Sequence, residues 1–167
     1  MTLDPELIER MAAIQRGGQE KYHQKLRDEG KPFARERLAR LLDPGTMVEE
    51  GLFARCADEG LPADAVVTVT GKIAGRPVCV MANDMTVKAG AWGRLTIQKI
   101  QRIQEIARDA ELPMLYLYLD LYRLASEFFI DAIVPGRSLR EDLCRRFETY
   151  ASRPRRPVRR WNGVIPG

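Results

Sequence analysis

The segment 83–93 contains the residues best suited to chemistry. It reads Asn-Asp-Met-Thr-Val-Lys-Ala-Gly-Ala-Trp-Gly and is predicted to join a strand to a helix. A glycine-bearing loop at such a junction exposes backbone N–H groups beside the positive end of the helix dipole, and Lys88 adds a mobile positive charge. The loop could therefore hold a phosphate, a thioester carbonyl or another developing anion. The spacing Lys-x-Gly-x-x-Gly is too short to be specific, so on spacing alone a purely structural loop is the better interpretation.

Other chemically capable side chains are isolated. His23 lies on the polar side of a predicted helix, with no serine or cysteine placed to form a nucleophile pair, so a surface histidine is expected. Asp64 and Asp84 are single carboxylates without metal-ligand spacing, and capping or turn roles are expected for both. No metal site is predicted.

The chain has three cysteines, an odd number at wide spacing, which suits neither a disulfide framework nor a zinc ribbon. Reduced thiols in the interior are expected. The three residues are Cys56, Cys79 and Cys144.

Two helices are predicted to precede the loop. Asp4 and Pro5 are typical of a helix start, and apolar residues then recur at near-helical intervals as far as Leu26, with Gly17-Gly18 loosening the middle of this first helix. A short second helix places Leu38, Leu41 and Leu42 on one side, and 43–45 ends it.

The middle of the chain predicts an α/β fold. The β-branched runs 66–70 and 77–81 read as a hairpin with Ala74-Gly75 at its turn. A helix ending before Pro113 follows, and 114–119 has the length and composition of a strand. The order strand, loop, helix, strand predicts a crossover in a largely parallel sheet. The residues expected on the buried side of the helix are Ile97, Ile100, Ile103, Ile106, Ala107 and Ala110.

The pattern after Leu119 is less coherent. Residues 120–129 read as helical although no turn separates them from the preceding strand, and 130–134 reads as another strand. Ser138 and Glu141 have the spacing of a capping box at the start of a further helix.

Charge and hydropathy narrow the function classes. The net charge is +4 over 167 residues, and the excess comes from a C-terminal Arg/Pro stretch that has only Trp161 beside it. We expect a solvated or subunit-contacting arm here and no nucleic-acid binding. No apolar run approaches the length of a membrane span, and the acidic N-terminus is unlike a secretory signal, so a cytoplasmic protein without membrane contact is expected.

A large part of the chain resembles a known family. Residues 30–31, 34–38 and 41–45 (Gly-Lys, Ala-Arg-Glu-Arg-Leu and Leu-Leu-Asp-Pro-Gly) look like the opening signature of the carboxyltransferase (beta) subunits of biotin-dependent acyl-CoA carboxylases, of the propionyl-CoA and methylcrotonyl-CoA type. The resemblance continues through segments at 46–49, 65–68, 71, 75–78, 83–90 and 111–117.

The C-terminal part resembles the end of the same family, through 125–135, Arg137 and 159–166. Family members are much longer and have two crotonase-like lobes, so the chain reads as internally shortened. The domain prediction is therefore the start of the N-terminal lobe at 1–117, a junction at 118–124, and the C-terminal end with its basic tail at 125–167. The fold implied is a partial crotonase-like (ββα superhelix) lobe with N-terminal helices.

The resemblance implies an activity that moves a carboxyl group from carboxybiotin to the α (or vinylogous) carbon of an acyl-CoA. Backbone N–H donors would stabilise the thioester enolate. Biotin would be carried on a separate subunit or domain, and a biotin carboxylase or biotin carrier subunit and oligomeric assembly are implied as partners. Only Lys88, Ala89 and Gly90 are carried over as acyl-CoA-proximal residues, no catalytic residue is assigned, and the shortened chain is expected to be inactive alone.

The alternative is a non-catalytic binding or assembly protein derived from that family. It would keep the N-terminal helices, the hairpin and the basic arm as contact surfaces. In either case self-association or docking on partners is expected, because so few helices cannot cover all the hydrophobic strands.

Overall fold

The computed structural model describes residues 4–58, 60–118 and 134–152. The chain divides into two compact units, 1–133 and 134–167, which are described separately. No helix within the described ranges combines the length and apolar character that a membrane span needs.

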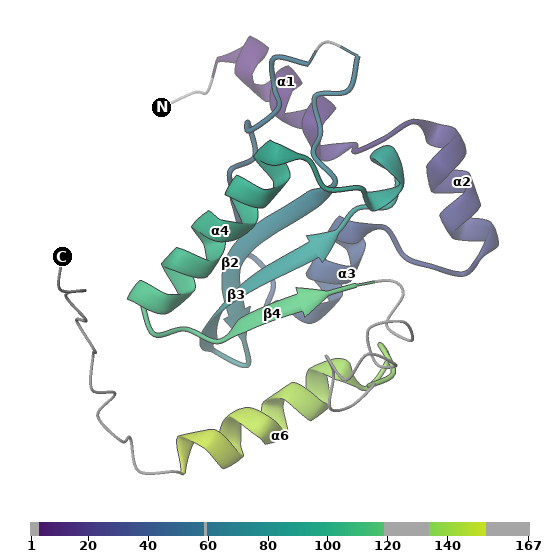
Figure 1. Cartoon of the computed structure of the whole chain (residues 1–167). Helices are drawn as coiled ribbons and strands as arrows, with labels where there is room; N and C mark the ends of the chain where they lie inside the picture. Colours follow the sequence, from purple (N-terminus) through teal and green to yellow (C-terminus); the bar gives the residue numbers. More distant parts are fainter. Residues whose placement is uncertain (1–3, 59, 119–133, 153–167) are drawn as a thin grey trace, which may run out of the picture. The chain divides into compact units, whose positions relative to one another are not determined.

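A four-stranded sheet organises the first unit. Its strands are β1 (Val48–Glu50), β2 (Val66–Ile73), β3 (Arg76–Asn83) and β4 (Met114–Leu117), in that spatial order. Figure 1 shows β2, β3 and β4 side by side. β1, β2 and β3 pair antiparallel, and only β3 and β4 pair parallel. The prediction of an α/β class is confirmed, but the expectation of a largely parallel sheet is wrong. A tight hairpin reverses the chain between β2 and β3, so a parallel pair can form only where a helix carries the chain back.

The predicted hairpin turn is present at Ala74-Gly75. Both residues adopt left-handed φ angles, 50° at Ala74 and 77° at Gly75, as a two-residue connection of this kind requires. The Asp43 carboxylate accepts hydrogen bonds from Ala74 N at 3.0 Å and Gly75 N at 2.8 Å. The residue that ends the second predicted helix therefore also fixes the turn of the hairpin.

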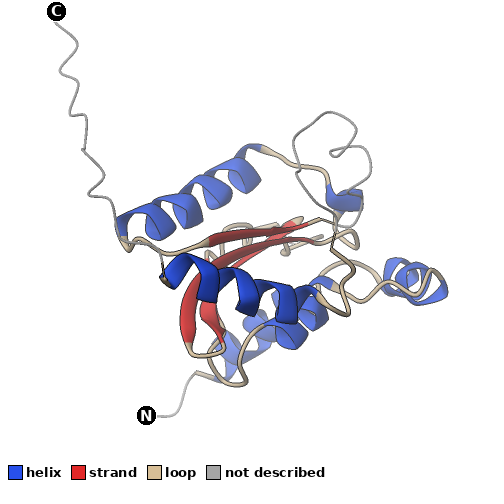
Figure 2. Cartoon of the chain, turned by 90° about the horizontal axis from the view of Figure 1, so that it is seen from below, coloured by secondary structure: helices blue, strands red, loops and turns tan. Residues whose placement is uncertain are grey.

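Helices cover the central strands on both faces. α4 (Arg94–Asp109) and α3 (Ala34–Leu41) each contact β2 and β3, and Figure 2 shows helices on either side of the strands. Side chains on both faces of β2 and β3 are accordingly buried, instead of alternating between core and solvent.

The buried stripe of α4 differs from the prediction. Ile100, Ile103 and Ala107 are buried as expected, and Ile106 is half-buried, but Ile97 is 47% exposed and Ala110 is also exposed. Thr96 and Lys99 take the inward positions in the first turns of the helix. These polar side chains can be buried because both find buried acceptors: Lys99 Nζ donates to Val66 O at 2.7 Å and Thr96 Oγ1 to Asp64 Oδ1 at 2.8 Å. The sequence did not predict this, because both acceptors lie far away in the chain.

The N-terminal segment forms two helices, so the prediction of one helix loosened in the middle is wrong. α1 (Pro5–Gln15) begins as expected, with Asp4 Oδ1 accepting from Glu6 N at 3.0 Å. α2 (Glu20–Asp28) follows a break at Gly17, whose φ is 75°. A left-handed residue cannot continue a right-handed helix, so the chain changes direction there.

The second unit contains α6 (Leu139–Ala151), which confirms the predicted helix. The predicted capping box is not formed, because the Ser138 side chain makes no cap hydrogen bond and its hydroxyl donates to Pro135 O at 3.1 Å. The predicted helix at 120–129, the strand at 130–134 except Val134, the junction at 118–124 except Tyr118, and the Arg/Pro tail beyond Ser152 lie outside the described residues.

We predict that Gly18→Ala destabilises the fold by about 3 kcal/mol, since overpacking a filled site forces the backbone to shift. A Cβ at Gly18 would lie 1.7 Å from Thr86 O. The free energy of unfolding in urea gives the measurement. Gly60→Ala is the matched control, because its added Cβ would meet nothing closer than 3.8 Å. Equal stability of the two variants would contradict the packing of the α1–α2 linker on Thr86.

Candidate functional site

The predicted loop contains three consecutive left-handed residues. It leaves β3 at Asn83, forms a short 3-10 turn at Lys88–Gly90, and enters α4 at Arg94. The φ angles are 47° at Lys88, 52° at Ala89 and 75° at Gly90. For residues with a Cβ this conformation costs about 1–2 kcal/mol each, so the surrounding structure has to hold it. Strain of this kind concentrates at ligand-binding sites.

Asn83 holds the C-terminal end of the turn. Its Oδ1 accepts from Trp92 Nε1 at 3.2 Å, and its Nδ2 donates to Gly90 O at 3.4 Å. The Met85 side chain packs directly against Gly90, and a Cβ at Gly90 would lie 2.6 Å from the Met85 sulfur. Only glycine therefore fits at position 90, both for its φ angle and for space.

The turn leaves two backbone donors without an acceptor. Gly90 N donates to Val87 O at 2.8 Å and Ala91 N to Lys88 O at 3.0 Å. The N–H groups of Lys88 and Ala89 donate to no acceptor in the described part of the chain. Lys88 and Ala89 are exposed and Gly90 is half-exposed. The structure thus brings the three predicted site residues together in one solvent-facing turn with two available N–H groups.

The charge of Lys88 acts on a neighbouring loop. The pKa of the Asp58 carboxyl is lowered, chiefly by the hydrogen bond from Arg55 and to a smaller degree by the positive charge of Lys88. Near the N-terminus of α4, one backbone donor is already used. Gly93 N already donates to Thr96 Oγ1 at 3.1 Å, so this donor is not available to a ligand.

The buried side chain of Asp84 fixes the backbone that leads into the turn. Asp84 is fully buried, and its Oδ1 accepts from Thr86 N at 2.9 Å and from Thr86 Oγ1 at 2.5 Å. Thr86 Oγ1 in turn accepts from Gly18 N at 2.9 Å. Asp84 has the turn role expected for it, and Asp64 accepts from Thr96 at the start of α4. No pattern in the sequence indicated that Asp84 and Thr86 connect the loop to the N-terminal helices.

Burial sets the ionisation of this region. It raises the pKa of the Asp84 carboxyl, while the hydrogen bonds from Thr86 and the charges of Arg35 and His23 oppose the shift. Burial also lowers the pKa of Arg37 to about 10. The Arg37 guanidinium donates to Asn83 O and, at 3.3 Å, to Leu117 O, so it ties together the ends of β3 and β4.

The remaining candidate residues have structural positions. His23 is half-buried on α2; its Nε2 lies 2.9 Å from Arg16 O and its ring 4.7 Å from that of Phe33. Cys79 is buried and Cys144 half-buried, but Cys56 is exposed, which corrects the expectation of interior thiols. The described residues contain no cluster of three or more histidine, cysteine or acidic side chains able to hold a metal ion.

Comparison with known proteins identifies similar sequences. The model of the carboxyl transferase domain family matches residues 25–119. An uncharacterized carboxylase of Bacillus subtilis is 55% identical over 117 residues, which is 70% of this chain and 23% of that protein. The beta chain of human mitochondrial propionyl-CoA carboxylase is 39% identical over 117 residues, 65% of this chain and 22% of that protein. This chain therefore spans less than a quarter of the length of these relatives.

Solved structures agree with this result. A crystal structure of transcarboxylase 12S, described with methylmalonyl-coenzyme A and methylmalonic acid bound, matches with a TM-score of 0.63 and 35% identity, over 71% of this chain and 26% of that chain. The beta subunit of geranyl-CoA carboxylase of P. aeruginosa matches with a TM-score of 0.53 and 27% identity, over 68% of this chain and 20% of that chain. These neighbours are crotonase-like carboxyltransferases, which confirms the prediction of a partial crotonase-like fold.

We predict that Asp84→Asn alters how stability depends on pH. A carboxyl group whose pKa is raised on folding contributes most to stability below its ordinary value of 3.8, and this contribution is lost as pH rises through the folded-state pKa. Asparagine stays neutral and retains the oxygen that accepts from Thr86.

The free energy of unfolding of the variant, relative to the natural chain, should therefore increase as pH rises from the ordinary value of 3.8 through the folded-state pKa of Asp84. Urea titrations at each pH provide the measurement. A difference that stays constant, or that shifts against the asparagine variant as pH rises, would contradict the assignment of a burial-raised pKa.

Proposed function

Because this chain belongs to the carboxyl transferase domain family, we propose that it is a carboxyltransferase component of a biotin-dependent acyl-CoA carboxylase. In that reaction a carboxyl group moves from carboxybiotin to the α (or vinylogous) carbon of an acyl-CoA. The names of the relatives support the proposal, since they include propionyl-CoA and 3-methylcrotonyl-coenzyme A carboxylase subunits.

The part of this function that the described residues can perform is binding of the acyl-CoA. We assign Lys88, Ala89 and Gly90 to the wall of that site. The observation that carries this assignment is the pair of available N–H groups, on Lys88 and Ala89, in a turn held left-handed by Asn83 and Met85. An acyl-CoA bears phosphates and a thioester carbonyl, and both accept hydrogen bonds from such donors.

The described residues give no comparable support for a biotin site. Two open hollows in the described surface each lie along a single helix, one on α4 and one on α6, and neither includes a residue of the loop. No residue of this chain is therefore assigned to biotin, and no transfer step is derived. Biotin would be carried on a separate subunit or domain, and a biotin carboxylase or biotin carrier subunit would be the partner. Oligomeric assembly is part of the proposal, and the hexamer assembly described for transcarboxylase 12S supports it.

A non-catalytic role is the second candidate. The observation that favours it is that the two N–H donors assigned above, on Lys88 and Ala89, belong to one loop. Carboxyl transfer through a thioester enolate needs donors that converge on the reacting atoms from several segments. A chain that retains one such loop and the sheet that positions it would bind without turnover.

We predict that Lys88→Ala weakens binding of coenzyme A about tenfold, because one charge-assisted hydrogen bond to a phosphate is lost. Isothermal titration calorimetry at low ionic strength gives the dissociation constant. Lys72→Ala is the matched control, an exposed lysine on β2 outside the loop, and should bind as the natural chain does. Equal affinity of both variants would overturn the assignment of the loop to the acyl-CoA wall.

We also predict that the 167-residue chain alone forms no carboxylated product from labelled carboxybiotin carrier and propionyl-, butyryl- or methylcrotonyl-CoA. Loss of one oxyanion donor costs about 3 kcal/mol of transition-state stabilisation, and the loss of several leaves no measurable rate. Acid-stable label is the readout. The control is a Gly90→Pro variant whose circular dichroism spectrum matches that of the natural chain. Product that exceeds the no-protein control with the natural chain, and that this variant does not form, would refute the expectation.

A further inference from the structure

An exposed tryptophan lies directly after the 88–90 turn. Trp92 is 45% exposed, and it stands two residues before α4 begins at Arg94. An indole is among the largest apolar surfaces that a side chain can offer to a ligand. The ring is not needed for the hydrogen bonds that the turn offers to an anion, so it can have a separate role at the same site.

The indole is held in place by the same side chain that holds the turn. Trp92 Nε1 donates to Asn83 Oδ1 at 3.2 Å, and Asn83 Nδ2 donates to Gly90 O at 3.4 Å. Because both bonds end on one amide group, the ring and the turn stay beside each other. The indole N–H is used in this contact, so a ligand meets the ring through its π face or its carbon edge. A ring fixed before binding also loses little conformational freedom on binding.

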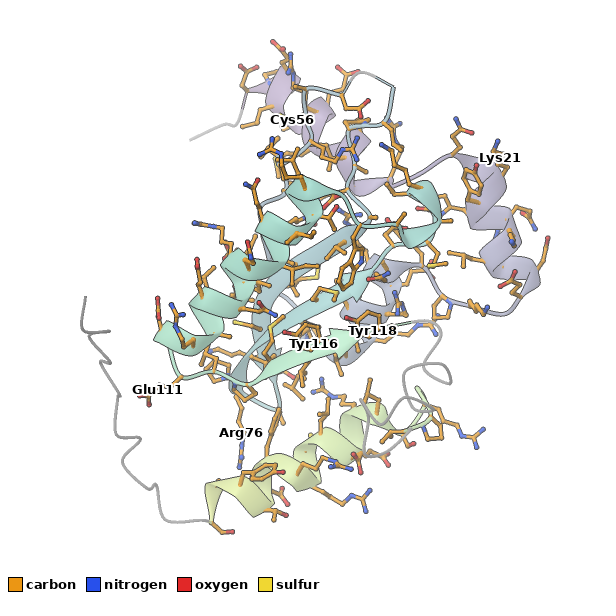
Figure 3. All side chains as sticks on the ribbon, in the orientation of Figure 1. Lys21, Cys56, Arg76, Glu111, Tyr116 and Tyr118 are labelled. Atoms are coloured by element: carbon orange, nitrogen blue, oxygen red, sulfur yellow. The ribbon has the colours of Figure 1, made fainter. Side chains whose placement is uncertain are left out.

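A second aromatic ring limits the movement of the indole. The ring centroids of Trp92 and Tyr118 are 6.2 Å apart and their planes are tilted by 31°, which is ordinary aromatic contact. Figure 3 shows Tyr118 at the end of β4, close to Tyr116, and these two rings are nearly parallel at 9°. The 45% exposure of Trp92 is what remains with these contacts in place, and it leaves area for a flat ring from a ligand.

The chemistry beside the indole points to a nucleotide. The turn offers the N–H groups of Lys88 and Ala89, and the exposed Lys88 ammonium adds a positive charge. Donors and a cation of this kind bind phosphate, and an aromatic side chain stacks on a base. A ligand that uses both must carry phosphate a few bonds away from a planar ring, as an adenine nucleotide does.

We propose that Trp92 stacks on the adenine base of the acyl-CoA while the 88–90 turn binds phosphate of the same nucleotide. The inference rests on the proposed function and narrows it, because it assigns this turn to the nucleotide end of the substrate. The other end, pantetheine with its thioester, carries no aromatic ring. A thioester carbonyl is also neutral, so it gains less from the Lys88 ammonium than a phosphate does.

The experiment uses the full chain with Trp161→Phe, which leaves Trp92 as the single tryptophan of the two in the sequence. Its fluorescence is followed while three probes are added: coenzyme A, adenosine 3′,5′-bisphosphate, and 4′-phosphopantetheine, which has a phosphate but no base. We expect the first two to quench the indole and to compete with each other. 4′-Phosphopantetheine should not quench it, because this probe brings no ring onto Trp92.

Substitutions of Trp92 separate stacking from positioning, with dissociation constants from isothermal titration calorimetry. Trp92→Leu should weaken binding of coenzyme A and of adenosine 3′,5′-bisphosphate about tenfold, since stacking on the base is lost. Binding of 4′-phosphopantetheine should change far less. Trp92→Phe keeps a ring but loses the N–H, so it should retain more affinity for the nucleotides than the leucine variant. A role confined to fixing Asn83 would instead make both variants equally weak toward all three probes.

Tyr22→Leu is the matched control. Tyr22 is 40% exposed on α2, and the Lys21 ammonium lies 4.9 Å from the centre of its ring. This variant should bind all three probes as the natural chain does. The circular dichroism of every variant is compared with that of the natural chain, and the quenching measurement does not depend on any change at Trp92.

Three results would overturn the proposal: adenosine 3′,5′-bisphosphate that neither quenches Trp92 nor competes with coenzyme A, unchanged affinity of Trp92→Leu for coenzyme A, or an equal loss of affinity for the probe without a base. If coenzyme A still binds the natural chain and Lys88→Ala weakens it, these results remove the stacking and leave the proposed function in place. Failure of coenzyme A to bind the natural chain would overturn both.

Discussion

The burial of the Asp84 carboxylate at the end of β3 is the constraint on which the candidate site depends. Asp84 Oδ1 accepts two hydrogen bonds from Thr86, and Thr86 accepts one from Gly18. These contacts join the sheet, the loop that follows it and the linker between α1 and α2. Burying a carboxyl group without hydrogen-bond partners is strongly unfavourable, so the arrangement persists only while these donors stay in place.

The conformation of the 88–90 turn follows from this support. Three left-handed residues in succession are unfavourable on local grounds, and the hydrogen bonds of Asn83 and the close packing of Met85 on Gly90 oppose that preference. Thr86 fixes the backbone two residues before the turn, and α4 fixes it shortly afterwards. The available N–H groups of Lys88 and Ala89 are thus a consequence of tertiary packing, and an isolated peptide of the same sequence would not maintain them.

The sequence predicted the elements whose signals are local. Ala74-Gly75 identifies the hairpin turn, Asp4 with Pro5 identifies the start of α1, and β-branched runs identify β2 and β3. The failures share a different cause. Gly17 and Gly18 break the first helix because Gly18 must approach Thr86 O closely, and Lys99 is buried because Val66 O accepts its ammonium. Both depend on residues far away in the chain, which periodicity cannot reveal.

The same distinction applies to the candidate site. Lys88, Ala89 and Gly90 could be selected because a glycine loop between a strand and a helix is visible in the sequence. Asn83, Trp92 and Thr86 were not selected, because their contribution lies in side-chain contacts across the loop. Such contacts position a donor without being donors to the ligand themselves.

A site that retains its positioning contacts keeps its affinity for an anion, whereas transition-state stabilisation also requires donors on the opposite side of the reacting atoms. The donors of the 88–90 turn can therefore contribute to binding without being sufficient for turnover.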